Sequence, residues 1–181
     1  MFDLCFTGEV VCDEGVTQHL GVMTLGEITV GIGASFSLWS EREYKRQWLE
    51  AARRLCDLDS CSAFITDVGD PPTPYMVKWS PAWHVNDLII FQSELLFIGA
   101  EEGNEAYNPR AAKFSLEDPY AAIPDRDEAH TEECRKTQIC RHPKIGSTSD
   151  YANTDLCGTE WCVYPDEIRE FVERRARDWR F

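Results

Sequence analysis

The chain has 181 residues, of which 32 are acidic and 18 basic, and a formal net charge of −14 at pH 7. A hydrophobic fraction of 43% and six tryptophans are typical of a globular domain, and a chain of this length buries enough surface for one core without disulfides or metal. The negative charge excludes direct binding of nucleic acid, which needs a basic surface, and no apolar run reaches the roughly 20 residues of a membrane span.

The chain begins with MFDLCFTGEVVCDEG, which lacks the basic start of a secretory signal. We therefore expect a cytoplasmic protein whose eight cysteines are reduced thiols. The first predicted strand is GEITVGI, residues 26–32. Residues 1–22 are interpreted as an N-terminal extension that precedes one domain spanning residues 23–181.

The stretch LWSEREYKRQWLEAARRL, residues 38–55, predicts an amphipathic helix with a well-marked start. Ser40 and Glu43 have the spacing of a capping box, and Trp39 and Tyr44 have that of a hydrophobic staple. Apolar residues then recur at helical spacing along one stripe, formed by Tyr44, Trp48, Ala51 and Leu55. We therefore interpret the aromatic residues as part of the core rather than as a catalytic or nucleic-acid-binding face.

Strands follow this helix. They are predicted at Cys61–Val68, Tyr75–Trp79 and Leu88–Ile98, and their short links favour an antiparallel meander. A strand at Thr159–Tyr164 precedes a helix that begins at Pro165. The order of elements predicts a single α+β domain, in which two main helices pack on a mostly antiparallel sheet of about five strands.

The region 127–157 shows no clear periodicity and is interpreted as an irregular insertion that contains cysteines. The weak candidates for a zinc site in and after this region are Cys134, Cys140, His142, Cys157 and Cys162. The cysteine spacings are looser than those of structural zinc sites, so reduced thiols are the favoured interpretation, with disulfides as an alternative. We expect neither a metal nor a cofactor.

No recognisable catalytic arrangement accompanies these elements. The four histidines occur in separate contexts, and the segment GIGASF lacks the third glycine of a dinucleotide-binding loop. The many pairs of carboxylates have no neighbour that would separate their pKa values, as acid–base catalysis requires. The sequence therefore predicts a protein that is not an enzyme.

Several motifs occur in an order that is known from one family. A Gly-Glu-Ile strand is followed by Trp-Ser-x3-Tyr-x2-Gln-Trp at 39–48, Ser-Ala-Phe-Ile-Thr at 62–66, a Trp-Ser-Pro corner at 79–81 and Leu-Leu-Phe at 95–97. In this order the chain resembles the immunity proteins of bacterial contact-dependent growth inhibition (CDI) systems. The resemblance implies a cytosolic protein that binds the toxic C-terminal domain of a cognate effector, often a basic nuclease, in a 1:1 complex.

The acidic charge gathers in the middle of the chain. Residues 56–133 contain 16 of the 32 acidic residues and four of the 18 basic ones, a net charge of −12. Such a surface attracts and orients a basic partner, and we predict that it covers the toxin's active site or substrate surface. The candidate contacts are acids expected in loops and two aromatic anchors: Asp67, Asp70, Glu101, Glu102, Glu105, Glu117, Asp118, Trp83 and Tyr107.

Two other classes of function stay open at this point. One is a small metal-dependent enzyme built on the cluster between Cys134 and Cys162. The other is a general protein-interaction adaptor.

Overall fold

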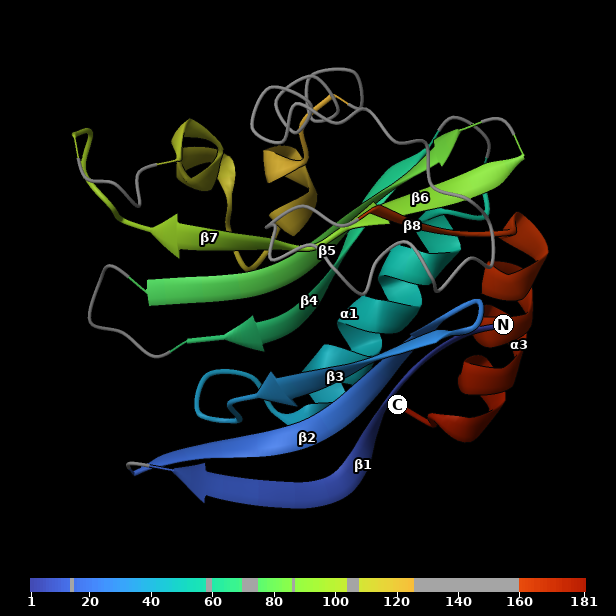
Figure 1. Cartoon of the computed structure of the whole chain (residues 1–181), viewed down its shortest axis with the longest axis horizontal. Helices are drawn as coiled ribbons and strands as arrows, with labels where there is room; N and C mark the ends of the chain where they lie inside the picture. The colour runs from blue at the N-terminus through green and yellow to red at the C-terminus, as the bar shows by residue number, and fades with distance from the viewer. Residues whose placement is uncertain (14, 58–59, 70–74, 86, 104–107, 126–159) are drawn as a thin grey trace.

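The computed structural model describes residues 1–13, 15–57, 60–69, 75–85, 87–103, 108–125 and 160–181. Strands precede and follow a central helix, and a second helix ends the described chain (Figure 1). The elements are β1 (Phe2–Asp13), β2 (Val16–Leu25), β3 (Ile28–Ala34), α1 (Glu41–Arg54), β4 (Cys61–Val68), β5 (Tyr75–Val85), β6 (Leu88–Gln92), β7 (Glu94–Ile98), the 3-10 helices η1 (Pro109–Lys113) and η2 (Pro119–Ala122), β8 (Glu160–Val163) and α3 (Pro165–Asp178).

The strands form two antiparallel sheets. The first has the order β1-β2-β3, and the second has the order β4-β5-β6-β8, with β7 paired to β5. The predicted α+β class, with two main helices and antiparallel pairing, is confirmed. The sequence predicted one sheet, because it gave no strands before residue 26.

The predicted strand 88–98 is divided into β6 and β7, which lie end to end along β5. Both halves pair with β5 in a single register, in which Trp83 lies opposite Ile90 and Lys78 lies opposite Leu95. His84 donates its backbone N–H to Ser60 on the β4 side, so the nitrogen of Pro81, an odd number of residues away, faces β6 and β7. Proline has no N–H to donate, which explains the break in the ladder.

The N-terminal hairpin of β1 and β2 contributes to the common core. Phe2 is fully buried, and its ring centroid lies 5.5 Å from that of Phe64, 5.6 Å from that of Phe91 and 4.9 Å from that of Phe171. These partners come from β4, β6 and α3, so the hairpin joins both sheets to the last helix. The domain boundary after residue 22 stays a prediction; in the structure that position lies inside strand β2.

Helix α1 begins as predicted and docks on the edge of the second sheet. Strand β4 is the first strand of that sheet, and polar atoms of α1 take the place of a further strand on its edge. Gln47 Oε1 accepts the N–H of Ile65 at 3.0 Å, the Trp48 indole donates to Ile65 O at 2.6 Å, and Tyr44 Oη accepts the N–H of Val68 at 2.9 Å. The predicted core role of these aromatic residues is confirmed.

Helix α3 lies beside the start of the chain, as the position of the N-terminus in Figure 1 shows. The guanidinium of Arg175 donates to both carboxylate oxygens of Asp3, at 2.6 and 2.8 Å. The ring of Phe171 packs against Phe2 one turn earlier in the helix. Together these contacts hold β1 and α3 against each other.

Candidate functional site

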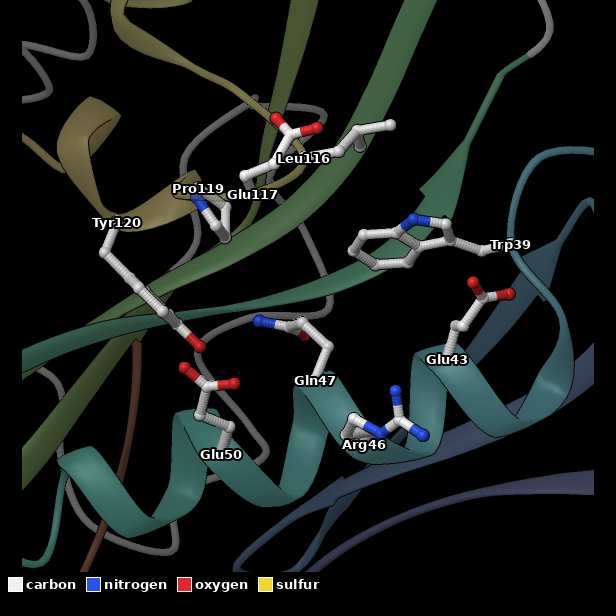
Figure 2. Close-up of a pocket in the computed structure, with 9 residues that line it drawn as sticks. All are labelled: Trp39, Glu43, Arg46, Gln47, Glu50, Leu116, Glu117, Pro119 and Tyr120. Atoms are coloured by element: carbon white, nitrogen blue, oxygen red, sulfur yellow. The ribbon is translucent and has the colours of Figure 1, made fainter. Parts of the chain in front are cut away.

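A pocket of about 190 Å³ lies between α1 and the segment 116–120 (Figure 2). It has an apolar and aromatic wall, a set of carboxylates, one guanidinium and one amide. The residues that line it are Trp39, Leu116, Pro119, Tyr120, Glu43, Glu50, Glu117, Arg46 and Gln47. The charged groups of the lining are therefore mostly negative, with three carboxylates against one guanidinium.

The capping box of α1 fixes one carboxylate of this pocket. Glu43 Oε2 accepts the backbone N–H of Ser40 and a hydrogen bond from its hydroxyl, both at 2.7 Å. These hydrogen bonds, helped by the charge of Arg46, lower the pKa of the Glu43 carboxyl below its usual range. The group is therefore held in its charged form beside Trp39, whose ring packs on Tyr44 with a centroid distance of 5.2 Å, as the predicted staple requires.

The opposite wall comes from the start of η2, where Pro119 precedes Tyr120. The guanidinium of Arg54 lies over the Tyr120 ring, 4.0 Å from its centroid. The Tyr120 hydroxyl is buried, makes no hydrogen bond of ordinary geometry and points toward the carboxylate of Glu50 (Figure 2). Burial, followed by the charge of Glu50, raises the pKa of Tyr120 to about 12, so the phenol stays protonated at neutral pH.

The chemistry of the pocket suits binding better than catalysis. None of its nine lining residues is a histidine, cysteine or serine. The pKa of Glu43 is lowered and that of Tyr120 is raised, so both pKa values lie further from neutral pH than the ordinary ones. A general acid or base works best when its pKa lies near the working pH. The volume is also below the roughly 300–1,000 Å³ of sites for small-molecule ligands, so the pocket is sized for a single side chain.

A second cavity, of about 360 Å³, lies between α1 and the C-terminal end of α3 with the residues that follow it. It has three arginines, Arg46, Arg53 and Arg180, and Glu50 as its acidic residue. Arg46 lies over the ring of Phe181, 5.8 Å from its centroid. Arg46 thus separates an acidic pocket from a basic cavity on neighbouring sides of α1.

Four of the predicted toxin contacts are exposed acids. Glu101 and Glu102 follow β7, and Glu117 and Asp118 precede η2. Of these four, Glu117 lines the pocket. Their roles in toxin binding stay predictions.

Two further predicted contacts are buried. Asp67 lies in strand β4 and not in a loop; it is 4% exposed, and its carboxylate accepts the N–H of Ser35 at 2.9 Å and pairs with Lys78 at 3.3 Å. Trp83 is also 4% exposed, and its indole donates to Pro124 O at 3.1 Å. Both side chains stabilise the fold in this structure and present little surface to a partner.

Several predicted residues lie outside the part of the chain that the structure describes. These are Asp70, Glu105, Tyr107, Cys134, Cys140, His142 and Cys157. Cys162, the last candidate zinc ligand, lies half-buried in β8. Among the described residues, no group of three or more histidine, cysteine, aspartate or glutamate side chains is placed to hold a metal ion.

Most of the pocket was not predicted from the sequence. Trp39 and Glu43 were assigned to the start of the helix, and Glu50 and Tyr120 were given no role. The available signal was the segment Leu116–Tyr120, where two acids stand among apolar residues. Nothing in the sequence indicates that this segment packs across α1.

A comparison with protein families gives a match to the CdiI N-terminal domain over residues 34–171, which is more than half of the chain. The chain belongs to this family. The resemblance to CDI immunity proteins drawn from the sequence motifs is thereby confirmed. The pocket residues Trp39, Glu43, Glu50 and Tyr120 all lie inside the matched range.

A solved structure described as a "CdiA-CT/CdiI toxin and immunity complex from Enterobacter cloacae" contains a chain of the same fold. The TM-score is 0.67 at 15% sequence identity, and the alignment covers 98% of this CdiI-family chain and 99% of the other. At this identity the similarity concerns the fold. No curated protein matches the chain.

Among the described residues, no helix has both the length and the apolar character of a membrane span.

Proposed function

We propose that this protein is a CDI immunity protein, which binds the toxic C-terminal domain of its cognate effector and neutralises it without being an enzyme itself. The observation that supports this most directly is the family match over residues 34–171. The shared fold with a chain from a solved complex of toxin and immunity protein agrees with it.

The proposed mechanism is occlusion of the toxin by the acidic surface. The toxin is a basic nuclease, and the immunity protein covers its active site or its substrate-binding surface in a 1:1 complex in the cytoplasm. Exposed carboxylates such as Glu101, Glu102, Glu117 and Asp118 support this mechanism, because complementary charge speeds the encounter of two proteins and orients them.

Charge alone does not give the affinity that neutralisation needs. A nanomolar complex corresponds to about −12 kcal/mol, and most of such binding energy comes from a few buried anchor residues. A surface that offers only solvated carboxylates lacks such anchors. The pocket between α1 and η2 supplies one place on this protein where an anchor of the toxin can be buried.

The test is co-expression with the C-terminal domain of the effector that is encoded immediately upstream. We expect this protein to restore growth of cells that make the toxin domain, and the two purified proteins to elute together as a 1:1 complex. Continued growth arrest in the presence of the folded immunity protein would overturn the proposal.

A further inference from the structure

The pocket between α1 and η2 combines two features that recognise one kind of side chain. Trp39 and Tyr120 give it flat aromatic surfaces; the carboxylate of Glu43 lies beside Trp39, that of Glu50 lies beside Tyr120, and Glu117 lines the pocket with its carboxylate directed outward (Figure 2). Aromatic faces attract a cation that is placed over them, and carboxylates bind a guanidinium through paired hydrogen bonds. Both features favour a planar cation over any other occupant.

Two of the three carboxylates are available to an incoming cation. Among the described residues, no ion pair involves Glu50 or Glu117, and both side chains are exposed at the mouth of the pocket. Glu43 is bound to Ser40 through one oxygen, Oε2, which leaves Oε1. The resident cation, Arg46, lines the pocket near Glu43, whose pKa its charge lowers, and also lies over the ring of Phe181 in the neighbouring cavity.

The pocket wall already holds one guanidinium in the free protein. Arg54 lies over Tyr120 at 4.0 Å, which is the stacking geometry that the ring offers to an arginine. Trp39 is only half-buried, and no described cation lies over its ring. The pocket thus has a second aromatic face, close to three carboxylates, that the protein's own arginines leave open.

We propose that this pocket binds an arginine side chain of the cognate toxin, with the guanidinium on Trp39 and attracted by the charges of Glu50 and Glu117. This rests on the proposed function, which supplies a basic partner. The volume of about 190 Å³ accommodates one long side chain. Arginine is favoured over lysine because its planar group stacks on the indole and can bond to a carboxylate through two N–H groups at once, whereas an ammonium is a more strongly hydrated point charge.

The first experiment measures toxin binding to matched charge variants of the full chain. Glu50→Gln with Glu117→Gln removes two charges from the pocket, and Glu170→Gln with Glu173→Gln removes two charges from exposed positions of α3 outside it. We expect the pocket variant to weaken the complex at least about tenfold, mainly through faster dissociation, and the control to change the Kd by less than about threefold. Equal effects of the two variants, or no effect of the pocket variant, would overturn the inference.

The second experiment tests the pocket without the toxin. Capped arginine (N-acetyl-arginine methylamide) and the matching capped lysine are titrated into the protein, and the indole N–H signal of Trp39 is followed by NMR. We expect a shift that saturates with arginine, is weaker with lysine and is lost in the pocket variant. Absence of any arginine-dependent shift, or an equal response to lysine, would overturn the inference.

The two experiments separate this inference from the proposed function. A toxin domain that fails to bind the wild-type protein refutes the immunity function, whatever the capped amino acids do. A toxin that binds the wild type and the pocket variant equally leaves the immunity function standing and refutes the arginine pocket.

Discussion

Helix α1 has two faces that differ in almost every physical respect. On the face toward β4, Tyr44 and Trp48 are fully buried, Gln47 is 8% exposed, and their polar atoms bind backbone groups. On the face toward η2, Glu43 and Glu50 are exposed and border a pocket. The residues that make the family recognisable therefore build the scaffold, whereas the residues placed to contact a partner look like any solvated helix surface.

The largest expected effect comes from removing strand β1, which covers part of the scaffold face of α1, the face with Tyr44, Gln47 and Trp48. The ring of Phe6 in β1 packs on that of Trp48 with a centroid distance of 4.8 Å, and Phe2 is fully buried. Loss of a single buried phenylalanine costs about 3–5 kcal/mol, against a total stability of about 5–15 kcal/mol. Deletion of residues 1–22 is therefore expected to abolish cooperative unfolding in thermal melts followed by circular dichroism.

A matched control for this deletion lies in the same hairpin. Val10 is 53% exposed near its tip, so Val10→Ser is expected to leave the melting temperature nearly unchanged. A cooperative transition in the deleted protein would show that residues from Met23 onward fold alone, as the sequence-based boundary predicts.

A smaller effect is expected from one polar side chain on the scaffold face. Gln47→Leu removes the partners of Ile65 N–H and Ala63 O, which Gln47 contacts at 3.0 and 2.6 Å. Each buried group left unpaired costs about 1–3 kcal/mol, so the free energy of unfolding in urea should fall by that amount or more. Glu50→Gln, one turn along the exposed face, should change it by less than about 0.5 kcal/mol. Similar losses in both variants would erase the distinction between the two faces.

The capping box gives a third and smaller effect. Ser40→Ala is expected to lower the free energy of unfolding by about 1 kcal/mol at pH 7. The pKa of Glu43 is lowered in the fold, so the stability that its carboxylate contributes is complete above the ordinary value of 4.5 and is lost as the pH falls through the lowered value. Urea titrations should therefore show the difference between variant and wild type shrinking in acid; a constant difference would contradict the role of Glu43 in the cap.

The smallest effect at neutral pH concerns Tyr120. The pKa of its phenol rises from 10 to about 12, so the stability that the protonated form contributes is present below pH 10 and is lost as the pH rises through 12. The effect is damped because the side chain is partly exposed. Tyr120→Phe should match the wild type near pH 7 and lose less stability than the wild type between pH 10 and pH 12. Parallel loss in both proteins would contradict the burial of this hydroxyl.

Much of the second sheet and of α1 was predictable because local signals and tertiary contacts agree there. Ser40 and Glu43 form the expected cap, and the predicted bounds of strand Cys61–Val68 match those of β4. The hairpin of β1 and β2 was missed although Phe2, Leu4 and Phe6 alternate, because exposed valines near the tip and a glycine turn with a φ of +82° at Gly15 interrupt the pattern.

The pocket could not be predicted from sequence for a different reason. Its two walls, at Trp39–Glu50 and Leu116–Tyr120, meet only because η2 packs near β4, which no local pattern records. For Asp67 a local signal was present but gave the wrong location. Its acidic side chain suggested a loop contact, yet the N–H of Ser35 and the ammonium of Lys78 satisfy it inside a strand.

The ion pair between β1 and α3 bears on when protection becomes available in the cell. Asp3 and Arg175 lie 172 positions apart, and Phe2 needs Phe171 to complete its surroundings. A ribosome adds about 5–20 residues per second, so roughly ten to thirty seconds pass between the synthesis of strand β1 and that of its partner helix α3. During that interval a nascent chain offers no closed core, and protection relies on immunity protein that was finished earlier.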